Sequence, residues 1–166
     1  MDDHSSRLWN YALVLYARRH VADACLALQD DHGLDVCELL WVCWLASRGM
    51  APAEDAGRAL EGVRGWQREV TRPLRAQRRA LKPLARDRPD IARLRQTIKE
   101  AELLAEREAL NRLQALAEAG LGVRQALPGD TLIASLRHLV AARHHETDEA
   151  LACLARAAGA EPGPPC

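Results

Sequence analysis

The sequence lacks the segments that would direct it into a membrane or a secretory route. Its first residues, Met1 to Ser6, contain no basic segment followed by an apolar one, so we expect no secretory signal. The longest apolar run, Leu39 to Ala46, is far too short to span a bilayer. We therefore expect a cytoplasmic protein that does not insert into a membrane.

Closely spaced cysteines are also missing. The five cysteines, of which Cys166 is the last residue, include no Cys-x-x-Cys pair. An odd count without close pairs indicates reduced thiols in a cytosolic protein.

No known catalytic motif occurs in the chain. It has no Gly-x-Ser-x-Gly, no P-loop and no Gly-x-Gly-x-x-Gly. A dimetal helical bundle would need a Glu-x-x-His on each of two helices, and this chain has none. Glu102, Glu106, His138, His144 and His145 therefore do not predict a metal site. We assign no catalytic residue, no metal and no cofactor, and we favour a function without catalysis while an enzyme remains the alternative.

A net charge of zero conceals a strong division of charge along the chain. Residues 1–57 hold 4 basic and 9 acidic groups, residues 58–99 hold 13 and 4, and residues 100–166 hold 6 and 10. A dedicated nucleic-acid binder is usually basic overall, so this balance disfavours nucleic acid as the partner. It leaves room for a local basic patch in the middle of the chain.

Helical patterning extends over nearly the whole sequence, and we detect no strand signals. The sequence predicts an all-α fold, a single-domain helical bundle of six to seven helices over residues 1–158, with a disordered tail at 159–166. The expected helices run from Ser5 or Ser6 to Arg18, Val21 to Asp31, Val36 to Ser47, Glu54 to about Pro83, Asp90 to Ala119, Asp130 or Thr131 to Arg143, and Thr147 to Ala158.

The third of these helices, Val36 to Ser47, is apolar on all sides apart from Glu38. A helix of this kind belongs in the middle of a core. We therefore interpret Trp41 and Trp44 as core residues rather than as a platform for a ligand.

The fourth helix carries a basic stripe. At about 100° per residue its cations share one face, and apolar side chains such as Val63 and Trp66 lie opposite. We expect Pro73 to kink this helix without changing its phase. The stripe consists of Arg64, Arg68, Arg72, Arg75, Arg79, Lys82 and Arg86.

Helices four and five are expected to form a long antiparallel helix hairpin that turns near residues 87–90. Glu102 and Glu106 fall within the apolar arc of the fifth helix, where an unpaired carboxylate would cost several kcal/mol. The hairpin register places Glu102 beside Arg75 and Glu106 beside Arg72. We expect these groups to form internal arginine–carboxylate pairs.

A set of short segments, spread over about residues 7 to 120, forms a recognisable pattern. The segments are Leu8-Trp-Asn-Tyr-Ala-Leu, Tyr16-Ala-Arg, Cys25-Leu-Ala-Leu-Gln-Asp, His32-Gly-Leu-Asp-Val, Trp44-Leu, Trp66, Pro73-Leu-Arg, Arg78-Arg-x-Leu-Lys82 and Glu102-Leu-x-x-Glu106. Together they resemble a family of small uncharacterised proteins from Gram-negative bacteria, known as a domain of unknown function. After Asp35-Val36, where the family pattern has Asn, this chain has Cys37. The resemblance implies no activity.

Two functions from different classes remain open. The first is a non-enzymatic interaction or adaptor protein whose basic face, with Arg64, Arg68, Lys82 and Arg86, meets an acidic protein partner. The second is an enzyme or ligand-binding protein that recognises a phosphate or carboxylate between the two long helices. A concave apolar pocket would favour the second function, and a flat solvated face would favour the first. The residues that would form this second site are Arg72, Arg75, Arg79, Glu102 and Glu106.

Overall fold

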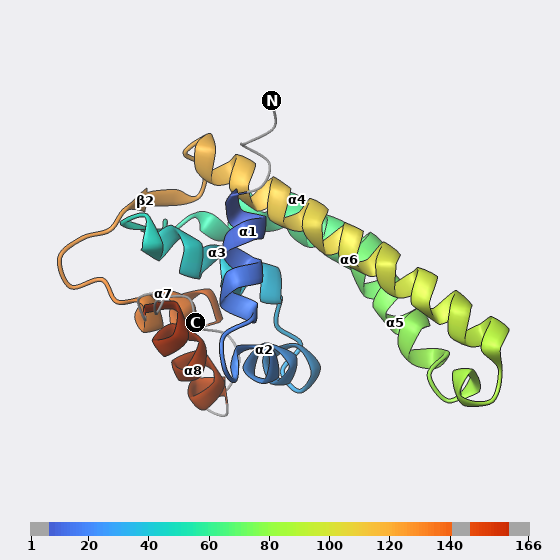
Figure 1. Ribbon diagram of the computed structural model, residues 1–166. Helices are drawn as coiled ribbons and strands as arrows, with labels where there is room; N and C mark the ends of the chain where they lie inside the picture. Colours follow the sequence, from blue (N-terminus) through green and yellow to red (C-terminus); the bar gives the residue numbers. More distant parts are fainter. Residues whose placement is uncertain (1–6, 141–146, 160–166) are drawn as a thin grey trace.

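The computed structural model describes residues 7–140 and 147–159, and helices dominate this part of the chain (Figure 1). The predicted all-α fold is confirmed. Ser5, Ser6, Arg143 and the expected tail after Gly159 lie outside the described residues. In chain order the elements are α1 (Arg7–Tyr16), α2 (Val21–Asp30), α3 (Val36–Ser47), β1 (Met50–Pro52), α4 (Ala56–Trp66), a π turn (Gln67–Thr71), α5 (Arg72–Ala80), a 3₁₀ turn (Leu84–Arg86), α6 (Pro89–Glu118), β2 (Val123–Gln125), α7 (Leu132–Val140) and α8 (Asp148–Gly159).

Helix α3 lies at the centre of the core, as its apolar sequence predicts. Trp41 is fully buried and Trp44 nearly so, and α1, α2, α6, α7 and α8 all pack against this helix. Asp35 caps the N-terminus of α3, because its Oδ1 accepts hydrogen bonds from the backbone N–H groups of Cys37 at 2.9 Å and Glu38 at 3.4 Å. No helix in the described part of the chain is long and apolar enough to cross a membrane.

Helices α4 and α5 form one continuous helix that is interrupted by the π turn. The N–H of Arg72 donates to the carbonyl of Gln67, which is the five-residue spacing of a π-helix. Pro73 follows at once, and it has no N–H to donate to the preceding turn. The expectation of an unchanged helical phase is therefore wrong, because the additional residue in the π turn rotates Arg64 and Arg68 relative to the cations of α5.

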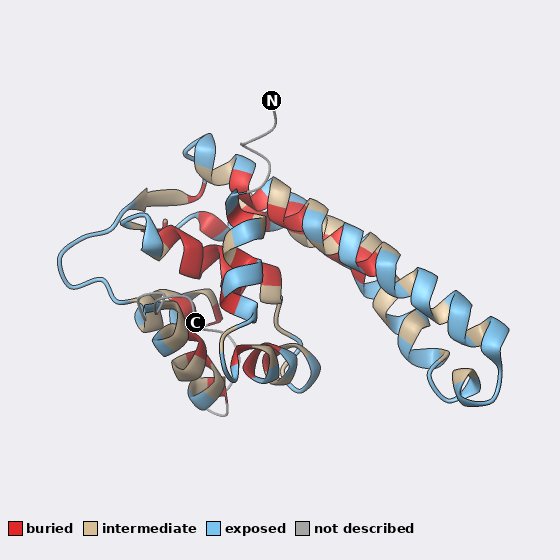
Figure 2. Cartoon of the chain, viewed as in Figure 1, coloured by how far each residue is buried: buried red, intermediate tan, exposed pale blue. Residues whose placement is uncertain are grey.

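The predicted antiparallel hairpin is confirmed and projects from the body of the molecule (Figure 1). Its arms are α5 and the N-terminal half of α6, joined by the 3₁₀ turn between Pro83 and Pro89. From residue 72 to residue 101 no side chain is buried, whereas α6 is buried at many positions beyond that point (Figure 2). The hairpin is thus an exposed arm whose base is anchored in the core.

A short strand pair corrects the expectation that the chain has no strands. Strand β1 pairs with β2 in an antiparallel register that places Met50 opposite Gln125 and Pro52 opposite Val123. Three residues are too few to show the alternation by which a strand is recognised in sequence. The pair links the end of α3 to the loop that follows α6.

Candidate functional site

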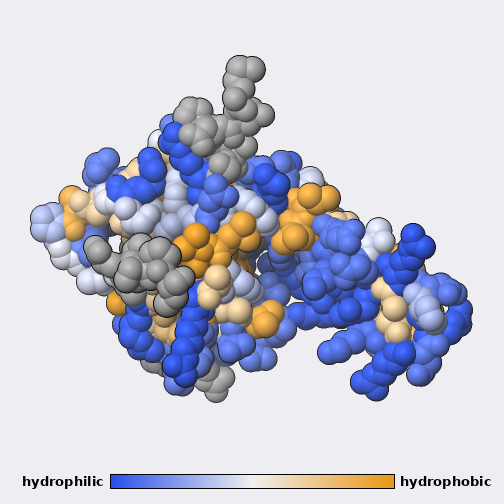
Figure 3. Space-filling view, in the orientation of Figure 1, coloured by the Kyte–Doolittle hydropathy of each residue, from blue (hydrophilic) through white to orange (hydrophobic). Residues whose placement is uncertain are grey.

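A cleft of about 750 Å³ opens where α1 and the start of α3 face the base of the hairpin. Much of its wall is apolar, and Trp9, Leu13 and Tyr16 of α1 lie opposite Leu103 of α6. Leu13 and Leu103 are half exposed, at 50% and 51%. The space-filling view shows hydrophobic side chains over α1 and the adjoining part of α6 (Figure 3). The concave shape and apolar wall are typical of a site for a small organic molecule.

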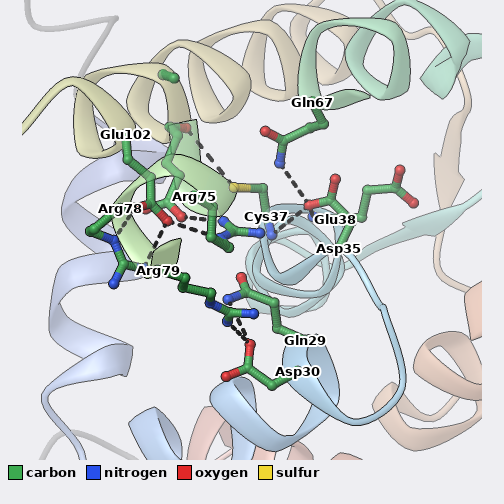
Figure 4. Close-up of polar contacts among 12 residues, drawn as sticks. Gln29, Asp30, Asp35, Cys37, Glu38, Gln67, Arg75, Arg78, Arg79 and Glu102 are labelled. Atoms are coloured by element: carbon green, nitrogen blue, oxygen red, sulfur yellow. Dashed lines mark hydrogen bonds and ion pairs between the residues drawn. The ribbon is translucent and has the colours of Figure 1, made fainter. Parts of the chain in front are cut away.

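Charged side chains form a connected network at the polar side of this cleft (Figure 4). Arg75 bridges two carboxylates, because its Nε lies 2.8 Å from Glu102 Oε1 and its Nη2 lies 2.7 Å from Glu106 Oε1. Arg78 donates from Nε to Glu102 Oε2 and, at 3.2 Å, from Nη2 to Oε1. Glu102 is only 5% exposed, so these bonds compensate for its loss of water.

The two glutamates of the network differ in their protonation behaviour. Burial is the largest influence on Glu102 and raises its pKa, but the hydrogen bonds and charges of Arg78 and Arg75 outweigh it, so the net pKa is lowered. Burial is also the largest influence on Glu106. The negative charges of Glu102 and Asp35 add to it, so the pKa of Glu106 is raised in spite of Arg75.

Polar groups also line the inner end of the cleft, at the start of α3. Asp35 Oδ1 accepts a hydrogen bond from Gln67 Nε2 at 3.0 Å in addition to capping α3, and Gln67 Oε1 has no hydrogen-bond partner among the residues that the structure describes. Burial, with the charges of Asp35 and Glu106, raises the pKa of the Cys37 thiol well above its ordinary value. Cys37 is therefore a neutral thiol rather than a thiolate nucleophile.

The structure places three of the five predicted ligand-binding residues in the network and separates the other two. Arg75, Glu102 and Glu106 are joined by direct ion pairs. Arg72 lines the cleft, is exposed, and forms no ion pair within the described residues. The expected ion pair between Arg72 and Glu106 does not occur within the described residues, because Arg75 contacts both glutamates. Arg79 lies outside the cleft wall and pairs with Asp30 of α2.

The four residues predicted to bind a partner do not form one surface. Arg64 is half-buried and forms a bidentate pair with the buried Glu38, at 2.8 and 2.9 Å. Arg68 lies 3.8 Å from Glu61 on an exposed face of the helix. Lys82 and Arg86 lie at the hairpin tip, where both are exposed.

Sequence reasoning missed several residues of the cleft. Arg78 lies off the basic stripe, but the hairpin register that pairs residue 75 with residue 102 also brings it close to this end of α6. Lys99 lines the cleft from α6, and the cations predicted from the sequence came only from the fourth helix. Asp35 gave no signal for the site, because a carboxylate just before a helix normally indicates an N-cap. The apolar wall from α1 carried no signal, because an apolar helix face normally predicts burial in a core.

No metal site accompanies the cleft in the part of the chain that the structure describes. Within residues 7–140 and 147–159, no group of three or more His, Cys, Asp or Glu side chains is placed to hold a metal ion. His144 and His145 lie outside these residues.

The fold and the cleft together define an all-α protein with an open, partly apolar cleft at the base of a helical arm. The chain belongs to the family described as "Protein of unknown function (DUF2390)", whose model matches residues 7–113. That span contains α1 to α5 and most of α6, and so it includes every wall of the cleft. No curated protein and no solved structure matches the chain.

Proposed function

We propose that the protein binds a small, mainly apolar molecule that carries a carboxylate or phosphate group, and that the cleft is its binding site. One observation carries this proposal. The apolar cavity of about 750 Å³ has Arg72 and Lys99 on its wall, and neither forms an ion pair within the described residues. Arg75 and Arg78 are already engaged by glutamates, so Arg72 and Lys99 are the cations that are free to receive an anion.

The geometry gives less support to an adaptor function that uses the whole basic stripe. An acidic partner needs a continuous field of unpaired cations. Arg64, Arg75 and Arg79 instead pair with carboxylates of this chain. The sequence pattern and the family resemblance support a cytoplasmic location in a Gram-negative bacterium as part of this proposal.

Catalysis is not part of the proposal. Glu102 is occupied by two arginines, and Cys37 is a buried neutral thiol. Neither group is in the state that a nucleophile requires.

Titration with octanoate, octyl phosphate and octan-1-ol tests the proposal, with the side-chain signals of Trp9 and Tyr16 followed by NMR. The two anions should produce saturable shifts of these signals. In the Arg72→Ala, Lys99→Ala double variant the affinity for the anions should fall about tenfold, equivalent to about 1.4 kcal/mol. The affinity for octan-1-ol should stay unchanged in that variant.

Arg68→Ala is the matched control, because it removes an exposed cation that does not line the cleft. It should bind all three compounds as the unmodified protein does. Absence of saturable shifts with both anions would overturn the proposal. Equal affinity for octanoate and octan-1-ol would show that the cations of the cleft do not contribute to binding.

A further inference from the structure

A second, smaller hollow lies at the tip of the hairpin and is independent of the cleft. It encloses about 260 Å³. Lys82, Ala85 and Arg86 line it from the turn, and Ala92 and Arg95 line it from the first turns of α6. Three cations, Lys82 and Arg86 from the turn and Arg95 from α6, therefore line the same hollow together with two alanines.

These cations are free to meet a ligand. Within the described residues none of Lys82, Arg86 and Arg95 forms an ion pair with a carboxylate, and no acidic residue lines the hollow. The closest acidic groups in sequence are Asp87 and Asp90, and Asp90 pairs with Arg88 at 3.6 Å. Arg95 is also held in place, because its Nε donates to the carbonyl of Arg78 at 3.2 Å, while its Nη groups form no ion pair with the residues that the structure describes.

We propose that this hollow binds a phosphate group. A single carboxylate is satisfied by one arginine, but three converging cations suit a tetrahedral group with more charge and more acceptor oxygens. The site also lies at the end of an arm with no buried residue, where a large ligand meets no obstruction from the body (Figure 1).

The phosphate has two possible sources, a free phosphate compound or the backbone of a nucleic acid. No aromatic side chain lies between residues 67 and 118. The arm therefore has no platform for stacking bases, and any nucleic acid would be held through its phosphates without a preference for sequence.

Titration of the full chain at low salt tests the proposal, with the arginine Nε–H signals of Arg86 and Arg95 followed by NMR. The probes are inorganic phosphate, pyrophosphate, an oligouridylate and poly-glutamate. Phosphate or pyrophosphate should shift both signals saturably, and the Lys82→Gln, Arg86→Gln variant should bind at least tenfold more weakly. This variant keeps Arg95 and its bond to Arg78, so the turn stays supported.

Arg88→Gln, Arg93→Gln is the control, because it removes two exposed charges from the same arm but none from the hollow. Its affinity should change by less than about twofold. Competition between oligouridylate and pyrophosphate for the same signals would identify a nucleic-acid backbone as the source, and binding of the small anions alone would identify a free phosphate compound.

Three results would overturn the phosphate site. These are the absence of saturable binding by phosphate, pyrophosphate and oligouridylate, equal losses in both double variants, and binding of poly-glutamate at least as tight as that of pyrophosphate. The last result would instead define a surface for acidic proteins. None of these outcomes depends on whether the cleft binds octanoate.

Discussion

Glu102 and Glu106 are one helical turn apart and share Arg75, yet they contribute to stability in opposite ways. Glu102 has two arginine partners and a lowered pKa, so its ionised form stabilises the fold. Glu106 has one arginine partner, and its pKa is raised above the ordinary 4.5. Its ionised form is therefore less favourable in the folded protein than in the unfolded chain.

This difference predicts opposite pH dependences for Glu102→Gln and Glu106→Gln. For Glu102, with a lowered folded pKa, the stabilisation is complete above the ordinary value of 4.5 and is lost as pH falls through the folded pKa. The destabilisation caused by Glu102→Gln should therefore shrink below about pH 4.5. For Glu106, the unmodified protein should lose stability relative to Glu106→Gln as pH rises above 4.5.

Urea unfolding of the three proteins between pH 3.5 and 7 measures both effects, provided that the m-values agree. The stability difference for Glu102→Gln should change below pH 4.5 and be flat above it. The difference for Glu106→Gln should change above pH 4.5. The same trend in both variants would show that the two glutamates share one environment, contrary to the structure.

At the scale of elements, the strand pair depends on a close approach between Gly122 and α4. Gly122 has φ +67°, and a Cβ at this position would lie 2.8 Å from Ala59 Cβ and 3.2 Å from the Cα of Ala56. Gly122→Ala should destabilise the protein by about 2–4 kcal/mol, because backbone strain and overpacking add together.

Gly120→Ala provides the matched control for Gly122→Ala. Gly120 also has a positive φ, +71°, but a Cβ there would meet nothing within 4 Å. Gly120→Ala should therefore lower the free energy of unfolding by the backbone strain alone, about 1–2 kcal/mol. Thermal or urea unfolding of both variants measures the difference. Equal losses of stability in Gly122→Ala and Gly120→Ala would mean that α4 moves away from the loop without a cost in free energy.

The success of sequence reasoning varied between elements for physical reasons. The hairpin register placed Arg75 beside Glu102 correctly, because two long helices joined by a short turn have one dominant alignment. The register did not predict the partner of Glu106, because an arginine has five donors and Arg75 uses two of them, at Nε and Nη2, to reach two carboxylates. The π turn before Pro73 was not predictable, since a helix with one additional residue keeps an almost normal pattern.

The cleft was only half predictable. Its charged side followed from Glu102, a carboxylate in an apolar arc that required a partner. Its apolar side depends on how α1 packs against α3 and α6, and packing between segments so distant in sequence leaves no local pattern. Figure 2 shows α1 exposed on one side and buried on the other. Sequence periodicity alone does not separate a core face from the wall of a cleft.

At the scale of the whole molecule, the body and the arm differ in how their helices are held. The body has a continuous apolar core around α3, whereas residues 72–101 contain no buried side chain. The arm is stabilised mainly by contact between its own two helices and by the Arg75 and Arg78 pairs at its base. Local opening of the arm therefore exposes little apolar surface and requires less free energy than unfolding of the body.

Native-state hydrogen exchange should consequently divide α6 at Glu102, its first buried residue after the turn. Amides of the arm between residues 78 and 96 should have protection factors at least about 100-fold lower than those of Trp41 and Leu113, which unfold only with the core. The boundary should move toward the body in Glu102→Gln, because that variant removes the carboxylate that pairs with Arg78 and leaves Arg75 paired with Glu106 alone. Uniform protection along α6 would mean instead that the arm and the body unfold as one cooperative unit, and that the helix–helix contact within the arm stabilises it without a buried core.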